Sequence, residues 1–87
     1  MKTFESLFAE LKAKNAAGDP ASSTVKELAK GKHFIGKKIV EEAAEVWMAA
    51  EHEGKVAASL EISQLIYHLQ VMMIACDIDL DDIYEQL

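Results

Sequence analysis

Five side chains whose oxygen atoms could take part in metal binding or phosphate chemistry recur at helical spacing in two segments of the chain. The first segment holds Glu41, Glu42 and Glu45, and the second holds Glu61 and Gln64. Residues three or four apart lie on the same side of an α-helix, so Glu42 points with Glu45 and Glu61 points with Gln64. If the two segments form neighbouring antiparallel helices, the two pairs can face each other.

Carboxylates that converge repel one another, and the repulsion costs more stability when the groups are partly buried. A hard divalent cation removes this repulsion, and oxygen ligands favour Mg²⁺, with Mn²⁺ as an alternative. Such an ion can orient phosphate oxygens and activate a water molecule, which is the chemistry that hydrolysis of a phosphoanhydride needs. An acidic helix face can equally be solvated surface, and the spacing alone leaves both interpretations open.

The hydrophobic pattern predicts an all-α fold built on two long helices. These are expected over residues 32–53 and 56–75, with a turn at Gly54 between them. The second helix carries two apolar stripes, which indicates that it packs on two sides at once. One stripe can face its own subunit and the other a second copy, so that two antiparallel hairpins form a four-helix bundle. We expect residues 1–87 to form one domain.

Shorter helices are expected to flank this pair. The first is predicted from an N-cap at Thr3 to about Asn15. Thr24 and Glu27 have the spacing of a capping box, which predicts a second short helix. Asp79 is suited to cap a closing helix.

The composition limits the partners of the chain. It has a net charge of −6, and all nine of its basic residues are lysines, so nucleic acid and anionic membranes are not expected as partners. No apolar run approaches the roughly 20 residues that span a bilayer, and no signal sequence is apparent. Cys76 is the only cysteine, which fits a reducing, cytoplasmic location. Hydrophobic residues make up 51%, more than a small bundle easily hides, which favours a homodimer.

Several other side chains have simpler interpretations. Trp47 and Val40 are expected in the core or at a dimer interface, and the methionines at 48, 72 and 73 are expected to fill the core. Lys32 and His33 are interpreted as ordinary solvated charges.

In their order, these segments resemble the phosphoribosyl-ATP pyrophosphohydrolase family, a branch of the all-α MazG-type nucleotide pyrophosphohydrolases. The superfamily pattern EExxE, a spacer and ExxD appears here as Glu41-Glu42-x-x-Glu45, fifteen residues, and Glu61-x-x-Gln64. The segments 22–24, 31–38, 65–68 and 79–83 are also similar to that family, so the resemblance covers nearly the whole chain.

The resemblance implies hydrolysis of phosphoribosyl-ATP to phosphoribosyl-AMP and pyrophosphate in histidine biosynthesis, by a dimer with Mg²⁺ sites. The implied roles are metal ligands for Glu42, Glu45, Glu61 and Gln64, phosphate contact for Lys38, water activation or further ligation for Glu41, and substrate contacts for Ser22, Thr24 and His68. Gln64 stands where the superfamily has Asp, so metal affinity should fall unless Glu41 compensates.

Two alternatives remain beside this interpretation. A related house-cleaning enzyme would share the metal ligands but hydrolyse ordinary nucleoside triphosphates; the segment 22–24 favours the histidine-pathway branch. A non-enzymatic helical dimer with a solvated acidic face is the third possibility.

Overall fold

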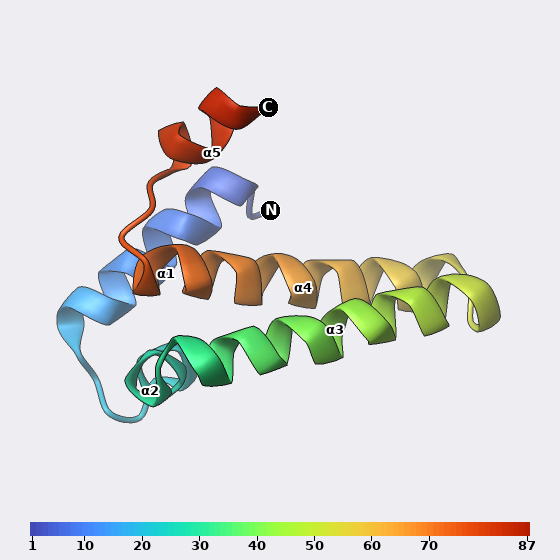
Figure 1. Cartoon of the computed structure of the whole chain (residues 1–87), viewed down its shortest axis with the longest axis horizontal. Coiled ribbons are helices and arrows are strands. Elements are labelled where there is room, and N and C mark those ends of the chain that lie inside the picture. Colours follow the sequence, from blue (N-terminus) through green and yellow to red (C-terminus); the bar gives the residue numbers. More distant parts are fainter.

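The computed structural model describes all residues 1–87, which form helices joined by short loops and no strands. In chain order the helices are α1 (Phe4–Ala17), α2 (Ser23–Lys30), α3 (Lys32–His52), α4 (Lys55–Ala75) and α5 (Leu80–Gln86). The two long helices, α3 and α4, lie antiparallel, and the shorter helices gather at one end of the pair (Figure 1). The predicted all-α class with two long antiparallel helices is confirmed.

Local signals at the helix ends explain most of these boundaries. Thr3 caps α1 in a capping box with Ser6, whose backbone N–H donates to the Thr3 hydroxyl at 3.0 Å. The helix ends at Gly18, whose φ of 67° is a left-handed conformation that glycine adopts without strain. Gly54, with φ 104°, makes the turn that joins α3 to α4. The predicted end of the first helix near Asn15 is two residues short of Ala17.

The capping box predicted from Thr24 and Glu27 is wrong. Helix α2 begins two residues earlier than that box implies, and its N-cap is Ser22, whose hydroxyl accepts from the backbone N–H of Val25 at 3.4 Å. The side chains of Thr24 and Glu27 are both buried against α4, where each has a hydrogen-bond partner. The two side chains that the local pattern predicted to cap the helix therefore make tertiary contacts with α4 instead.

The core lies where α1 meets the hairpin. Leu11, Ile35 and Val71 are almost completely buried there, and Leu28 of α2 packs against them. The buried amide of Gln70 adds a polar contact, because its Nε2 donates to the backbone carbonyl of Phe4 at 2.8 Å. These contacts fix α1 and α2 to the end of the hairpin remote from Gly54.

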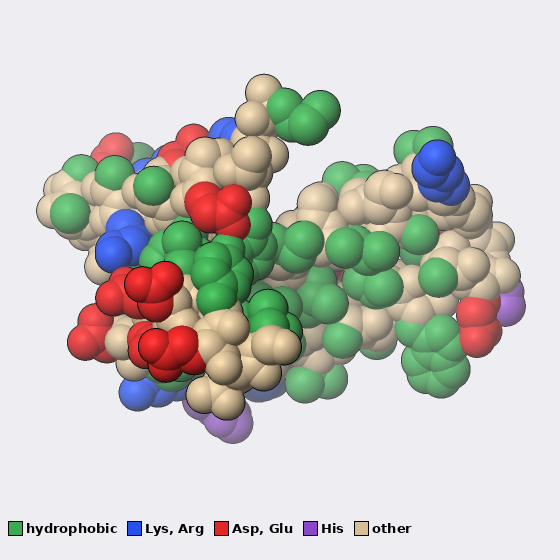
Figure 2. Space-filling model, turned by 90° about the horizontal axis from the view of Figure 1, so that it is seen from above, with side chains coloured by type: hydrophobic (Ala, Val, Ile, Leu, Met, Phe, Trp, Pro, Cys, Tyr) green, Lys and Arg blue, Asp and Glu red, His purple; other side chains and the backbone are tan.

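The other end of the hairpin projects beyond the rest of the molecule. We call this part, residues 44–62, the hairpin arm; Figure 2 shows hydrophobic side chains gathered over it. Its exposed apolar residues include Trp47, Met48, Val56 and Leu60. In this single chain Trp47 and Val40 face outward, with 66% and 71% of their surface exposed, so they are not part of its core, and their place at a dimer interface stays a prediction. Met48 is exposed as well, so the prediction that it fills the core is wrong, whereas Met73 is buried as predicted.

None of the helices combines the length and the hydrophobicity that a membrane-spanning segment needs.

Candidate metal and phosphate site

Three carboxylates converge where α3 crosses the middle of α4. One oxygen atom from each of Glu42, Glu45 and Glu61 lies within 4.8 Å of the other two. Glu42 and Glu45 are one turn apart on α3, and the antiparallel pairing set by the Gly54 turn brings Glu61 of α4 across to them. Glu42 is buried, Glu61 is half-buried and Glu45 is exposed, so the cluster opens to solvent on one side. The structure thus brings together three of the four residues predicted as metal ligands.

Electrostatics make this cluster costly without a cation. Burial raises the pKa of Glu42 above its ordinary value, and the hydrogen bond and charge of Glu45 raise it further. Partial burial and the charge of Glu45 likewise raise the pKa of Glu61. Each raised pKa means that the ionised form is disfavoured where it stands. A bound cation would lower this electrostatic cost.

The buried end of Glu42 gives a second observation. Its Oε2 atom is buried and has no hydrogen-bond partner within the chain. Buried polar atoms nearly always have a partner, and where one has none in the protein, a bound ion can take that place. An unpartnered carboxylate oxygen beside two further carboxylates fits the donor set of a hard divalent cation.

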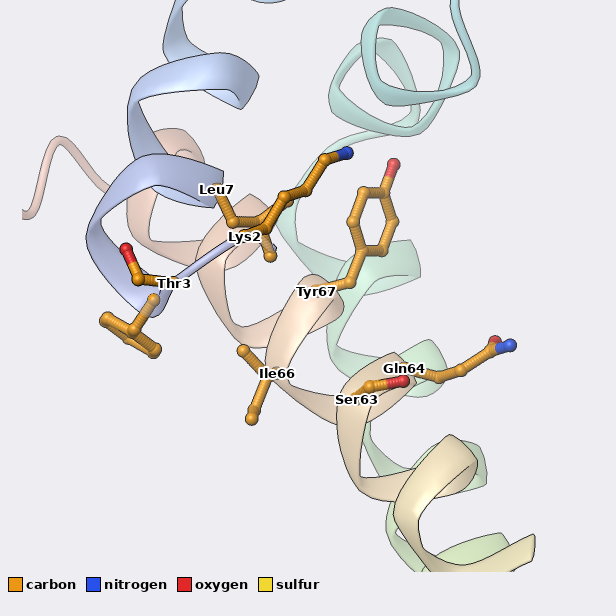
Figure 3. A pocket seen from close by; sticks show the side chains of 8 residues that line it. Lys2, Thr3, Leu7, Ser63, Gln64, Ile66 and Tyr67 are labelled. Carbon is orange, nitrogen blue, oxygen red and sulfur yellow. The ribbon is translucent and has the colours of Figure 1, made fainter. Parts of the chain in front are cut away.

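Gln64 is exposed on α4, one helical turn beyond Glu61. It lines a pocket of about 430 Å³ between α4 and the start of α1, together with Ser63, Tyr67 and the segment from Lys2 to Phe4. Figure 3 shows its amide pointing out from α4 and away from Lys2 and Thr3, at the edge of this pocket. The role predicted for Gln64 as a ligand is still a prediction.

A separate groove with basic side chains runs along α3, and none of the three clustered carboxylates lines it. It has a volume of about 530 Å³, and its lining includes Lys32, His33, Lys37 and Glu41. Lys38 forms an ion pair with Glu41 at 3.5 Å. Exposed pairs of this kind contribute roughly 0–1 kcal/mol, so Lys38 can exchange its partner for a phosphate at little cost. Lys32 and His33, interpreted from the sequence as ordinary solvated charges, are therefore part of the groove.

The predicted substrate contacts at the start of α2 are not equally accessible. Ser22 is half-buried at the N-cap of α2. Thr24 is 1% exposed, and its hydroxyl is hydrogen-bonded to the hydroxyl of Tyr67 at 2.8 Å. In Figure 3 the Tyr67 hydroxyl points toward α2. The geometry joins Thr24 to α4, while its predicted contact with substrate stays a prediction.

His68, predicted as a substrate contact, is buried behind the carboxylate cluster. Its Nδ1 lies 2.9 Å from Glu27 Oε2, and its Nε2 lies 3.9 Å from Glu42 Oε1. The sequence interpretation missed Glu27 because capping seemed to account for it. No local pattern in the sequence indicates that its side chain turns inward, because its partner His68 is 41 residues away.

An antiparallel helix pair that holds three converging carboxylates is the arrangement of an all-α nucleotide pyrophosphohydrolase. A model of the phosphoribosyl-ATP pyrophosphohydrolase family matches residues 1–87, and the chain belongs to this family. The resemblance drawn from the sequence motifs is thereby confirmed.

Curated relatives agree over their full lengths. The chain is 63% identical to a phosphoribosyl-ATP pyrophosphatase of Salinibacter ruber over 87 residues, covering 100% of both chains. It is 68% identical to one of Streptomyces coelicolor, covering 99% of this chain and 97% of that protein. A phosphoribosyl-ATP pyrophosphatase of Bifidobacterium animalis subsp. lactis is 67% identical, with 100% of both chains covered.

Proposed function

We propose that this chain hydrolyses phosphoribosyl-ATP to phosphoribosyl-AMP and pyrophosphate, the second step of histidine biosynthesis. The observation that carries the proposal is the convergence of Glu42, Glu45 and Glu61 in a chain that matches the family from end to end. The relatives are named for the same activity on the same substrate.

We further propose that Glu42, Glu45 and Glu61 hold Mg²⁺, or Mn²⁺ in its place. The unpartnered Oε2 of Glu42 and the raised pKa values of Glu42 and Glu61 support this assignment. When bound, a divalent cation supplies the positive charge that phosphate oxygens and an attacking water need. We also propose Gln64 as a ligand, whose amide oxygen would add a neutral donor.

The remaining chemistry belongs to side chains of α3. Lys38, which lies one helical turn before Glu42 on α3, binds and orients the polyphosphate of the substrate. Glu41, which is exposed and paired with Lys38, takes the proton of the attacking water once phosphate has drawn Lys38 away. The attack is direct, because phosphoryl transfer to water requires no covalent intermediate on the protein.

We also propose that the active form is a homodimer in the cytoplasm. The exposed apolar residues of the hairpin arm supply a surface on which a second hairpin can pack to complete a four-helix bundle. The cytoplasmic location follows from the proposed role in amino-acid biosynthesis.

The experiment that tests the activity is pyrophosphate release from phosphoribosyl-ATP, with and without Mg²⁺, beside a panel of ordinary nucleoside triphosphates. We expect Mg²⁺-dependent release from phosphoribosyl-ATP alone. Release only from ordinary triphosphates would assign the chain to a house-cleaning role. No release from any of them, at metal concentrations that saturate the protein, would contradict an enzymatic role altogether.

A further inference from the structure

Three buried side chains from three helices form a line that ends at the carboxylate cluster. Glu27 of α2 contacts His68 of α4 at 2.9 Å, and the opposite edge of the His68 ring faces Glu42 of α3 at 3.9 Å. The exposed fractions of the three side chains are only 10 to 12%. Burying charged and polar groups lowers the stability of a protein unless they are paired, so three such groups in a line suggest a functional role.

The chemistry of the first contact fixes the orientation of the ring. An ionised carboxylate can only accept hydrogen bonds, so the proton of this contact belongs to Nδ1 of His68, which donates it to Glu27. With that edge of the ring held, the opposite edge packs against Glu42, and its Nε2 lies 3.9 Å from Oε1, a contact longer than a hydrogen bond. Glu27 therefore determines where the second edge of the imidazole points.

The two carboxylate oxygens of Glu42 have different surroundings. Its Oε1 faces His68, while its other oxygen, Oε2, is buried and has no partner in the chain. In metal sites, polar groups behind a ligating carboxylate hold it in the geometry that the ion requires.

We propose that Glu27 and His68 are positioning residues for the metal site: Glu27 orients His68, and His68 holds Glu42 in the orientation that binds the cation. The inference rests on the proposed function, because it takes Glu42 as a ligand. It assigns His68 a place behind the site instead of a contact with substrate, in keeping with the burial of its side chain.

The structure offers a matched control for this proposal. Thr24 and Tyr67 also join α2 to α4, through a hydrogen bond of 2.8 Å, and Tyr67 is the immediate neighbour of His68 in sequence. Unlike His68, Tyr67 has no contact with a carboxylate of the cluster among its hydrogen bonds. The variant Tyr67→Phe therefore weakens the attachment of α2 without touching the line that leads to Glu42.

The test is a titration of the full chain with Mn²⁺, followed by the electron paramagnetic resonance signal of the free ion, together with the thermal midpoint of each variant. In His68→Asn the amide nitrogen can replace Nδ1 toward Glu27, but nothing reaches Glu42. In His68→Gln the longer side chain can replace Nε2 toward Glu42. We expect His68→Asn to weaken Mn²⁺ binding by about 10- to 100-fold at unchanged stoichiometry, the range typical of such outer groups. His68→Gln should recover part of this loss, and Glu27→Gln should show a smaller loss in the same direction.

The outcomes separate this inference from the proposed function. If His68→Asn binds Mn²⁺ as tightly as the unchanged protein while Glu42→Gln does not bind, the metal site stands and the positioning role is wrong. If Tyr67→Phe loses as much affinity as His68→Asn, the role is general support of the fold, and the inference is again overturned. If Glu42→Gln binds Mn²⁺ normally, the proposed metal site itself fails, and the inference fails with it.

Mg²⁺ dependence of activity gives a second readout. A ligand that is misoriented but present should still bind when enough metal is supplied. Hydrolysis by His68→Asn should therefore recover toward the normal kcat as the Mg²⁺ concentration rises. A defect that Mg²⁺ does not relieve would contradict the positioning role.

Discussion

Glu42 meets two opposing demands at the scale of a single residue. Its carboxylate is buried, which disfavours its charge, and it faces the carboxylates of Glu45 and Glu61, which disfavour the charge further. A residue chosen for the stability of the isolated chain would not be ionisable at this position. The conflict is typical of sites where function has been retained at a cost in stability.

The substitution Glu42→Gln should separate these two demands. We expect it to remove most of the hydrolytic activity, because a ligand is lost. In metal-free protein the same change should raise the free energy of unfolding by about 1 kcal/mol, because a buried charge and its repulsion are removed. Pyrophosphate release and urea denaturation in a chelating buffer measure the two effects. A variant with unchanged stability without metal and full activity would show that the cluster is only a solvated acidic surface.

Glu41 differs from its neighbour by being exposed and paired with Lys38. If it is the base, Glu41→Gln should lower kcat by about 10²- to 10⁴-fold, as is usual for loss of a general base, and should leave the Mn²⁺ affinity unchanged. Glu41→Gln protein that loses metal affinity instead would identify Glu41 as a further ligand. Steady-state kinetics and a Mn²⁺ titration on one preparation distinguish the two roles.

The sequence predicted the carboxylate cluster but not what stands behind it. The spacing of Glu42 and Glu45 and the hairpin about Gly54 were enough to bring Glu61 opposite them. The contact between Glu27 and His68 joins residues 41 apart in sequence, and no local pattern encodes such a pairing. Gln64 shares the helical spacing of Glu61, yet it lies at the edge of a separate pocket, because spacing fixes the side of a helix and not the reach of a side chain.

At the scale of elements, the boundaries that depend on local chemistry were predictable. Gly54 and Asp79 act as the sequence indicated, and the two long helices begin and end within one residue of their expected positions. The start of α2 was not predictable in this way, since Thr24 and Glu27 have partners on α4 that override their capping propensity.

Helix α5 and its N-cap Asp79 make polar contacts with α1 at the surface. The hydroxyl of Tyr84 donates to a carboxylate oxygen of Glu5 on α1, and Lys12 of α1 contacts Asp79 at 3.3 Å. The hydrogen bond to Glu5 raises the pKa of Tyr84 above its ordinary value. Because the raised pKa belongs to the folded state, the contact stabilises the protein fully below the unfolded value of about 10 and is lost as pH rises through the folded value.

The substitution Glu5→Gln should bring the pKa of Tyr84 back toward that of a free tyrosine. A spectrophotometric titration near the phenolate absorbance, in a Tyr67→Phe background, isolates the signal of Tyr84. A midpoint that does not move on substitution would show that Tyr84 and Glu5 are not in contact in solution. The free energy of unfolding of Glu5→Gln should also fall less steeply with rising pH in the alkaline range, because the contact that Tyr84 ionisation breaks is already absent.

At the scale of the whole molecule, the hairpin arm is the part that the chain does not cover by itself. It exposes Val56 and Leu60, which lie one turn apart on α4, beside Trp47 and Met48 of α3. Exposed apolar residues grouped in this way usually mark an interface. The hairpin arm belongs to the same two helices that carry the carboxylates. A second copy bound to the arm would therefore pack close to the proposed metal site.

The substitution Leu60→Asp should convert the proposed dimer to a monomer, because a charge would be buried in the new interface. Analytical ultracentrifugation should show the mass fall by half at the same protein concentration. His52→Asp places a charge on exposed surface near the Gly54 turn and should leave the mass unchanged. A Leu60→Asp protein with the same mass as the unchanged chain would exclude this face of α4 as the interface.

The buried amide of Gln70 has a consequence for how the chain selects one native arrangement. A slide of α1 along α4 by one turn, about 5.4 Å, would take the backbone carbonyl of Phe4 away from the Gln70 amide nitrogen, to which it lies at 2.8 Å. A buried amide group left without a partner costs roughly 1–3 kcal/mol. This one directional bond therefore adds a penalty against shifted arrangements to the packing of Leu11 in the core.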